Sequence, residues 1–238
     1  GLHQKDLKIT TCVFSFKSST FKETFTSGSS MGVYILPDET DPSRTARCQY
    51  KNIRAQAIRQ TDRSIRWECD SAIRLCSRPI RVFAYYPYRP TASRDTASVP
   101  VRISADARFT PDFRFGTITR GHKPVNQYSP VAMLSLKHGL ALLSFRVCTE
   151  TDFTGNFLLE SIQVGNCAGS GRFCQRGKVN IVNGEIEGVS DAPGATLLPL
   201  RPAKKLTSDP GNSLKIRVLP LSEPLGKKEI EVIFRING

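Results

Sequence analysis

The stretch VAMLSLKHGLALLSFRV, from Val131 to Val147, decides the fold of this chain. Read as a strand, it first places alternate residues on one face, and from Leu143 the apolar face moves by one position. The two sets that share a face are Leu134, Leu136, His138, Leu140 and Leu142, and then Leu143, Phe145 and Val147. A change of phase by one residue within a strand is what a β-bulge produces. We therefore expect a long, bent central strand of an all-β domain.

Two other structures fit the same stretch less well. As a helix, it places one residue in every turn on a single stripe, namely Leu136, Leu140, Leu143 and Val147. Gly139 in mid-run and Pro130 before it favour a strand. As a membrane span, it is interrupted by a lysine, a histidine and an arginine. We therefore interpret this stretch as a strand, and we interpret the rest of the chain in relation to it.

Further strand-like segments flank this run, separated by Gly, Pro, Asn and Asp at intervals of about 8–12 residues. They are 7–16, 31–36, 50–59, 64–69, 80–88, 99–109, 157–166, 174–189, 214–221 and 229–236. We expect residues 110–130 to form a long, loosely structured connection, and Asn183-Gly184 to form a hairpin turn. The polar segment from Thr149 to Asp152 is the expected boundary between one domain at residues 1–150 and another at residues 151–238.

The chain is strongly basic, with 34 Lys and Arg residues against 21 Asp and Glu and a formal net charge of +13. Ten of the basic residues and three of the acidic ones lie between Arg44 and Arg81. Such a bias is typical of a solvated, arginine-rich sheet face, and it also suits binding to acidic polymers, lipopolysaccharide or nucleic acid. The 238 residues have room for one large domain or two small ones, and their 39% hydrophobic content excludes a disordered chain.

The seven cysteines are an odd number, so at least one of them stays a thiol. Cys69 and Cys76 are seven residues apart, as are Cys167 and Cys174, and either pair can bridge in an oxidising compartment. Buried, reduced cysteines are the equal alternative. No C-x-x-C motif and no Cys/His cluster occurs at zinc spacing, so we expect no metal site and no cofactor.

No motif commits the chain to a reaction. Gly28-Ser29-Ser30-Met31-Gly32 matches the G-x-S-x-G nucleophile elbow, but it opens a strand where the elbow must open a helix. Residues 165–171 share only their glycine content with a phosphate loop. Of the three histidines, His3, His122 and His138, we interpret the last as a buried histidine bonded to a backbone carbonyl. We therefore expect no enzyme and no catalytic residue.

Four segments, taken in order, resemble the fimbrillin family, which comprises major- and minor-fimbrial-antigen-like surface proteins of gut and oral anaerobic bacteria. They are FTSGSSMGVY at 25–34, YKN at 50–52 with Trp67 downstream, VFAYYPY at 82–88 and LSLKHGLALLSFRV at 134–147. The resemblance covers most of residues 7–150 and, less closely, the second half of the chain. Ser29 stands where the family often has Asp, and family members usually continue beyond a segment such as 233–238 into another hairpin.

What the resemblance implies is an all-β chain of two tandem transthyretin-like Greek-key β-sandwich domains, the second of them short or incomplete. It also implies export as a lipoprotein to the cell outer membrane and a location on the extracellular surface. Subunits of the family assemble into a fimbria by strand donation, because a donated strand satisfies the open backbone groups and the apolar groove of a sandwich that lacks one strand. Residues 7–16 and 229–236 are the candidate donor strands.

The sequence thus predicts a non-enzymatic subunit, or an accessory or tip adhesin, of a cell-surface fimbria (pilus). The expected partners are other pilin subunits and a host protein or glycan. A surface glycan-binding module is the alternative, and it rests on the aromatic side chains of Trp67, Tyr85, Tyr86 and Tyr88. A third interpretation, binding of anions or nucleic acid, rests on the arginine-rich segment, although we expect no nucleic-acid partner.

Overall fold

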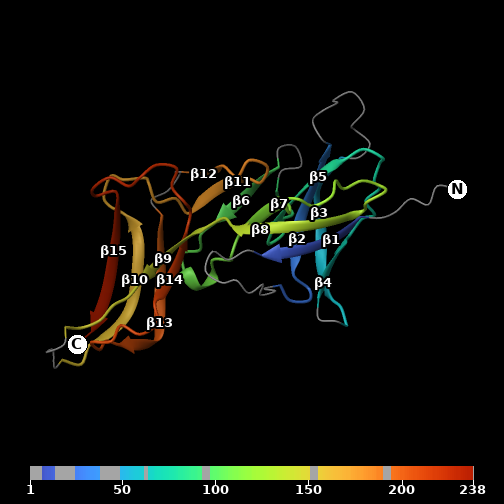
Figure 1. Ribbon diagram of the computed structural model, residues 1–238. Helices are drawn as coiled ribbons and strands as arrows, with labels where there is room; N and C mark the ends of the chain where they lie inside the picture. The colour runs from blue at the N-terminus through green and yellow to red at the C-terminus, as the bar shows by residue number, and fades with distance from the viewer. Residues whose placement is uncertain are drawn as a thin grey trace. The chain divides into compact units, whose positions relative to one another are not determined.

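The chain is all-β, as the sequence predicts (Figure 1). The structure is a computed structural model that describes residues 7–13, 25–37, 49–61, 64–92, 97–150, 155–189 and 194–237. Its strands are β1 (Lys8–Val13), β2 (Ser30–Pro37), β3 (Tyr50–Arg59), β4 (Ile65–Cys69), β5 (Ile80–Tyr86), β6 (Ser98–Arg102), β7 (Arg114–Ile118), β8 (Val131–His138), β9 (Ala141–Phe145), β10 (Leu158–Asn166), β11 (Arg176–Asn180), β12 (Ile186–Val189), β13 (Ala195–Lys205), β14 (Leu214–Val218) and β15 (Ile230–Asn237). A 3-10 turn, η3 (Ala107–Phe109), follows β6, and no helix among the described residues is long and apolar enough to cross a membrane.

The chain forms two compact units and passes between them more than once. The ranges of the first unit are Gly1–Val99, Phe113–Gly139 and Val179–Glu185. Those of the second unit are Pro100–Asp112, Leu140–Lys178 and Ile186–Gly238. A boundary after Glu150 between independently folding domains stays a prediction.

Seven strands of the first unit close into a barrel, in the order β1-β4-β3-β2-β5-β7-β8. Neighbouring strands are antiparallel except β1 and β8, which run parallel over six registered residue pairs. Where the resemblance implies a two-layer sandwich, β1 pairs with both β4 and β8 and so joins the two ends of the sheet. The barrel is therefore the observed form of the first unit.

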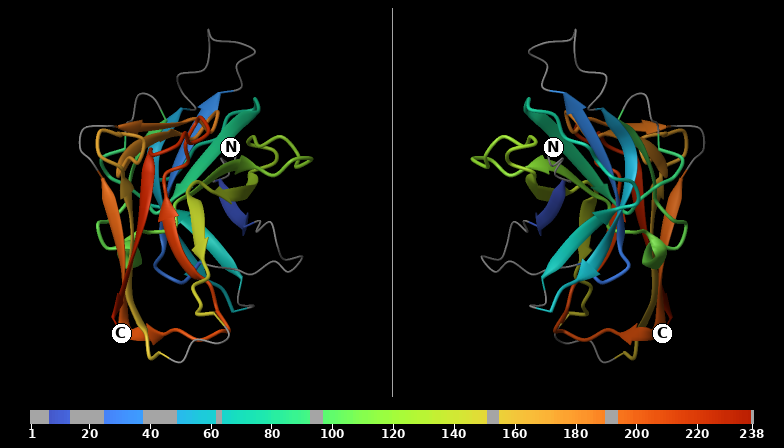
Figure 2. Two further views of the ribbon diagram at one scale, coloured as in Figure 1. Left: turned by 90° about the vertical axis from the view of Figure 1, so that its left-hand side faces the viewer. Right: turned by 90° about the vertical axis from the view of Figure 1, so that its right-hand side faces the viewer.

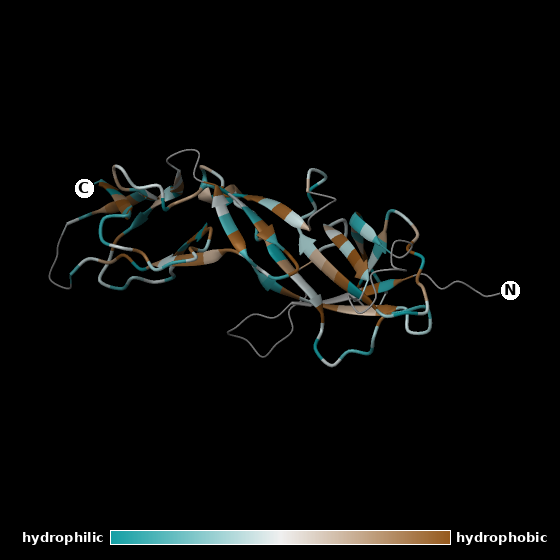
Figure 3. Cartoon of the chain, turned by 90° about the horizontal axis from the view of Figure 1, so that it is seen from above, coloured by the Kyte–Doolittle hydropathy of each residue, from teal (hydrophilic) through white to brown (hydrophobic). Residues whose placement is uncertain are grey.

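Successive side chains of the barrel strands point to opposite faces, as extended backbone requires, and in β4 and β8 buried and accessible residues alternate accordingly, whereas in β2 and β5 most side chains of both faces are buried. In β4, Ile65 and Trp67 are buried whereas Arg66 and Glu68 are exposed. Figure 3 shows the same alternation as brown and teal bands along the strands. The predicted strand at residues 64–69, with this alternation, is confirmed.

The stretch from Val131 to Val147 forms two strands, so the prediction of one bent strand with a bulge is wrong. β8 ends at His138 and pairs with β7 and β1, whereas β9 begins at Ala141 and pairs with β14. Gly139 lies between them, where its N–H donates to Phe113 O at 2.8 Å and an added Cβ would lie 2.7 Å from the Phe113 ring. The change of phase is real, but it marks the passage from the first unit to the second.

The two faces expected for this stretch are confirmed in part. Leu134 and Leu136 are fully buried in the barrel, and Leu143 and Phe145 pack against the core of the second unit. Leu142 was expected on the first face but is 51% exposed, because it belongs to β9 and points away from that second core.

Two strands lie where the sequence did not predict them. β7 falls inside residues 110–130, and its Phe115 is buried in the first unit. The prolines and glycines around this short strand are typical of a loop, so the sequence did not predict a strand there. β13 contains Pro199 and Pro202, which a strand tolerates at the edge of a sheet because no ladder hydrogen bond is lost there.

The second unit packs the three-stranded sheet β13-β10-β15 against the pair β14-β9. β10 lies between β13 and β15 and is antiparallel to both, as the quarter-turn views in Figure 2 also show. Val164 of β10 and Ile216 of β14 belong to one buried core. The ring of Phe145 on β9 meets that of Phe234 on β15 edge-to-face, with centres 5.9 Å apart. Two layers around a shared core make a sandwich of these five strands.

A further sheet, in the order β12-β11-β6, contains the predicted hairpin. The turn joining β11 to β12 includes Asn183 and Gly184, and the N–H of Gly184 donates to Asn180 O at 2.8 Å. Gly184 has a φ of +82°, a conformation that glycine adopts without strain. The hairpin prediction is therefore confirmed.

Candidate functional site

Strand β15 forms an open edge of its sheet. It pairs antiparallel with β10 at eight registered positions, from Ile230 opposite Asn166 to Asn237 opposite Leu158. On its other side it has no strand partner among the residues that the structure describes. Unpaired backbone N–H and C=O groups along such an edge are a template for another strand. β15 is therefore the first candidate site.

The side chains of β15 are apolar on one face and mixed on the other. Val232, Phe234 and Ile236 lie on the face of β15 that is turned toward β9, where the Phe234 ring contacts Phe145. These three side chains are 36%, 41% and 46% exposed. On the opposite face Ile233, which is 47% exposed, lies between Glu231 and Arg235. The opposing layer has only two strands, so it leaves this edge strand partly uncovered. A row of large exposed apolar side chains is typical of a protein interface.

The barrel of the first unit is most weakly paired between β1 and β4. β1 is registered with β8 at six positions but with β4 at one, Ile9 opposite Trp67. Parallel pairing such as that of β1 with β8 is also slightly less stable per residue than antiparallel pairing. The contact between β1 and β4 is therefore the place where an added strand would displace the fewest paired residues of the barrel.

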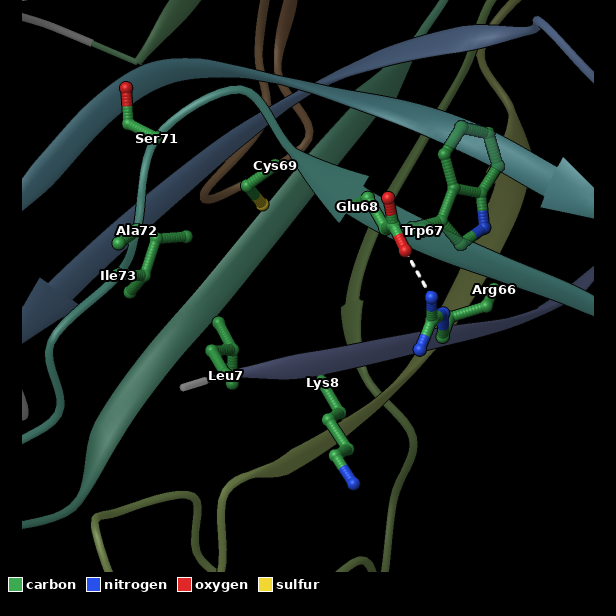
Figure 4. Close-up of a pocket in the computed structure, with 9 residues that line it drawn as sticks. All are labelled: Leu7, Lys8, Arg66, Trp67, Glu68, Cys69, Ser71, Ala72 and Ile73. Atoms are coloured by element: carbon green, nitrogen blue, oxygen red, sulfur yellow. Dashed lines mark hydrogen bonds and ion pairs between the residues drawn. The ribbon is translucent and has the colours of Figure 1, made fainter. Parts of the chain in front are cut away.

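A pocket of about 360 Å³ lies at this seam (Figure 4). β1 and the residue before it contribute Lys8 and Leu7, whose side chains lie on opposite sides of the ribbon in Figure 4. β4 and the loop after it contribute Arg66, Trp67, Glu68, Cys69, Ser71, Ala72 and Ile73. The volume is at the lower end of the range for small-molecule sites, roughly 300–1,000 Å³. It accommodates a few side chains of an added strand or one small ligand.

Two of the charged side chains that line the pocket are paired with each other, and its thiol is inert. Arg66 and Glu68 form an ion pair on the outer face of β4, and Arg54 Nη1 lies 3.9 Å from Asp70 Oδ2. Exposed pairs of this kind stabilise by about 1 kcal/mol at most. Burial raises the pKa of the Cys69 thiol to about 11, and the neighbouring Asp70 carboxylate adds to the shift. The pocket therefore offers no thiolate nucleophile at neutral pH.

The arginine-rich segment between Arg44 and Arg81 lies largely on the outer surface of β3, β4 and the connection to β5. Arg54 and Arg66 are in the ion pairs just described, and Arg59 and Arg74 are exposed. Positions 44, 47 and 63 lie outside the described residues. The described arginines are spread singly over the surface, which supports the interpretation as a solvated sheet face.

The aromatic side chains considered for glycan stacking do not form an exposed platform. Trp67 and Tyr85 are 2% and 0% exposed, and Tyr86 and Tyr88 are half-buried. The ring of Phe25 contacts those of Trp67 and Tyr86 edge-to-face, with centres 5.1 Å and 5.0 Å apart. The glycan-binding interpretation therefore loses Trp67 and Tyr85, and it keeps only the partly accessible Tyr86 and Tyr88.

The hydroxyl of Tyr85 closes a buried polar cluster instead. It donates to Asn52 Oδ1 at 2.7 Å and accepts a bond from the Arg89 N–H at 3.0 Å. Asn52 Nδ2 in turn donates to Arg89 O at 3.0 Å. Burial raises the pKa of Tyr85 far above its ordinary value, and burial followed by the nearby Tyr88 raises the pKa of Tyr34 to about 12. The cluster holds the chain after β5 in place.

Ser30 and the histidines are not gathered into a site. Ser30 opens β2, and its hydroxyl accepts a bond from Arg54 Nε at 3.2 Å. His138 is exposed, so the prediction of a buried histidine is wrong: it is the last residue of β8, where the strand leaves the barrel wall. His122 Nδ1 lies 2.8 Å from Lys123 O, and His3 lies outside the described residues.

Neither candidate disulfide forms. Cys69 and Cys76 are both thiols, as is Cys167, while Cys174 Sγ donates to Gly171 O at 3.7 Å. The glycine-rich segment 165–171 makes a turn that connects β10 to β11, without a helix after it. Within the described residues, no group of three or more His, Cys, Asp and Glu side chains is placed to hold a metal ion.

Sequence reasoning named residues 229–236 as a strand but missed the pattern that distinguishes them. In β15, Glu231, Ile233 and Arg235 share one face in the order acid, apolar, base. This order of charges can be read from the sequence, because alternate residues of a strand lie on the same face. The pocket residues of the loop 71–73 carry no such signal, because the loop reaches the seam only in the folded barrel.

Comparisons with known proteins agree on a family and a fold. A family model described as fimbrillin-like matches residues 18–238. No curated protein sequence matches the chain. Among solved structures, a Bacteroides ovatus protein assigned to cell adhesion has a TM-score of 0.63 at 18% identity, covering 97% of this chain and 86% of that one.

Two further solved structures are similar to the same extent. A Bacteroides uniformis protein assigned to cell adhesion has a TM-score of 0.62 at 16% identity, covering 97% of this chain and 80% of that one. A fimbrial protein from Bacteroides vulgatus has a TM-score of 0.62 at 14% identity, covering 96% and 82%. At these identities the structural likeness shows the fold alone.

Proposed function

Because the chain belongs to the fimbrillin-like family, we propose that it is a subunit or adhesin of a cell-surface fimbria. The family match carries this proposal, since it spans residues 18–238 and so includes parts of both compact units. A structural neighbour with the same fold is itself a fimbrial protein. The role is structural and adhesive, and it involves no catalysed reaction.

We propose further that subunits join by addition of a strand to an open edge. The exposed edge of β15 supports this, because its backbone groups and its row of apolar side chains suit another strand. The seam at β1 supports it as well, since β1 is held to β4 through a single registered pair. The Greek-key, transthyretin-like arrangement implied by the resemblance belongs to the same proposal for the second unit, since the first unit forms a closed barrel.

The remaining parts of the proposal concern location and partners. The mature chain lies on the extracellular surface, joined to the outer membrane through a lipid anchor on its precursor or through other subunits. Its partners are other pilin subunits and a host protein or glycan. Nucleic acid is not among the proposed partners, since the described arginines of residues 44–81 are spread singly and two of them are in ion pairs.

Immunogold electron microscopy of intact cells of the source organism tests the proposal. Antibodies raised against the purified chain are expected to label surface filaments along their length if the chain is a stalk subunit, and at their ends if it is a tip adhesin. A strain lacking the gene is the matched control and should lose the label. Label confined to the cell interior, or spread over a surface without filaments, would overturn the proposal.

A further inference from the structure

We propose that the edge of β15 pairs antiparallel with β15 of a second copy of this chain, in a register centred on Ile233. The inference rests on the proposed function and deepens it, because it names the partner of one open edge. Three features of the strand support this pairing: its exposed side chains, its position at the sheet edge and the order of its charges.

The charges of β15 are arranged so that the strand is complementary to itself. In an antiparallel pair, directly opposite residues have a constant sum of numbers and point to the same face. With Ile233 opposite Ile233 of the second copy, Glu231 lies opposite Arg235, and Arg235 lies opposite Glu231. Neither side chain has an ionic partner among the described residues of a single chain. The pairing therefore creates two symmetric opposite-charge pairs around a central apolar one.

The other face of the strand matches in the same register. Val232 lies opposite Phe234 of the second copy, and Ile230 lies opposite Ile236. These side chains are apolar, and three of them are more than a third exposed in the single chain. Pairing two such edges continues the row of apolar side chains across both copies, where each covers the other from water.

Neighbouring registers are worse. A pair centred on Val232 puts Glu231 opposite Ile233, and a pair centred on Phe234 puts Arg235 opposite Ile233. Each of these places a charge against an exposed isoleucine. A shift by a single residue in one copy alone turns the apolar face of one strand toward the mixed face of the other. The alternation of β15 thus specifies one register.

The pair has a two-fold axis and yields a closed dimer with a continuous sheet in the order β13-β10-β15-β15-β10-β13. The seam at β1 in the first unit remains available to other subunits. One edge of eight residues is smaller than a standard stable interface, so we expect a dimer that dissociates on dilution, with association measurable at concentrations on the order of 100 μM.

Charge reversal tests the register. Each of the single variants E231R and R235E places like charges opposite each other twice, and each should weaken dimerisation about tenfold or more. An equimolar mixture of the two variants restores both opposite-charge pairs and should dimerise, as should the double variant E231R/R235E. Analytical ultracentrifugation reads the result as a shift of mass from 26.4 kDa toward twice that value.

The control variant is E187R, which makes the same change of charge on an exposed residue of β12 and should dimerise like the unchanged chain. The inference is overturned if the unchanged chain stays a monomer up to the highest concentration. It is also overturned if the single variants dimerise as well as the unchanged chain, if their mixture does not, or if E187R has the effect of E231R. Circular dichroism establishes that every variant keeps its strands.

Cross-linking gives an independent readout of the same register. I233C should form a disulfide with I233C of the second copy under mild oxidation, whereas V232C faces Phe234 and should not link to itself. Mass spectrometry of the linked peptides separates these products from links between native cysteines. A link through V232C in place of I233C would refute the register.

The two proposals fail separately. Filaments labelled on cells, with purified E231R dimerising normally, would leave the fimbrial function in place and remove the β15 pair. Restored dimerisation in the mixed variants, with no labelled filament, would do the reverse.

Discussion

At the scale of single residues, Gly32 and Tyr85 show how tightly the barrel interior is specified. A Cβ added at Gly32 would lie 2.1 Å from Tyr85 Cε1. The Tyr85 ring has little freedom to move away, because its hydroxyl is bonded to Asn52 and to the backbone of Arg89. Gly28, by contrast, lies in the turn before β2 and has a φ of +88°.

We expect Gly32→Ala to lower the free energy of unfolding by about 3 kcal/mol, because it overpacks the core against Tyr85. Gly28→Ala is the matched control: its Cβ would meet no atom within 4 Å, so its cost is the backbone strain alone, about 1 kcal/mol. Urea denaturation of both variants measures the difference. Equal losses would show that the Tyr85 ring moves aside freely.

Cys69 gives a prediction about pH. Burial raises the pKa of its thiol from 9.0 to about 11, so alkylation by iodoacetamide at pH 8 should be much slower than at the exposed Cys148 and should rise as the pH approaches 11. Because the folded-state pKa is the higher one, the contribution of this thiol to stability is present below pH 9.0 and is lost as the pH rises through about 11. Peptide mass spectrometry follows each site, and equal rates at pH 8 would contradict the burial of Cys69.

At the scale of elements, strands with a clear period of two were predictable and strands interrupted by proline or glycine were not. β4, β5 and β15 follow their predicted segments closely, because alternation and apolar content agree there. β13 was missed because Pro199 and Pro202 contradict a strand anywhere but at an edge, and edge position is a property of the sheet. β8 and β9 were merged because the sequence shows the change of face but not which sheet each strand joins.

The two faces of β8 should respond differently to the same truncation. Leu136→Ala removes a fully buried side chain from the barrel core and should cost about 2–5 kcal/mol of the free energy of unfolding. Met133→Ala, on the outer face of the same strand and 38% exposed, should cost less than about 1 kcal/mol. Thermal or urea unfolding measures both. A larger loss for Met133→Ala would mean that the strand lies with its other face inward.

At the scale of the whole molecule, the net charge of +13 predicts weak, non-specific binding to polyanions at low ionic strength. We expect retention on heparin that disappears near 0.15 M salt, where the Debye length is about 8 Å. R59E/R74E on the arginine-rich surface should reduce retention no more than K215E/K227E elsewhere. A selective loss with R59E/R74E would reveal a dedicated polyanion site.

The family was predictable from the order of four short segments, and the match over residues 18–238 confirms that resemblance. The candidate sites were only partly predictable. The residues of β15 are predictable as a strand from their sequence. Its position at the edge of a sheet is not, because that depends on which strands pair with it, and among the described residues only β10 does. The aromatic residues Trp67 and Tyr85 looked like a stacking surface because composition does not reveal which face of a strand is inward.

The parallel pairing of β1 with β8 also has a mechanical consequence. If tension enters at the N-terminal end of β1 and leaves from the C-terminal end of β8, the two strands are pulled past each other lengthwise. Their six registered pairs are then stretched together and must rupture at once, instead of unzipping one at a time. A protein pulled in this direction resists force better than one whose pairs open one after another, and its lifetime under load is set by the rate of that single rupture.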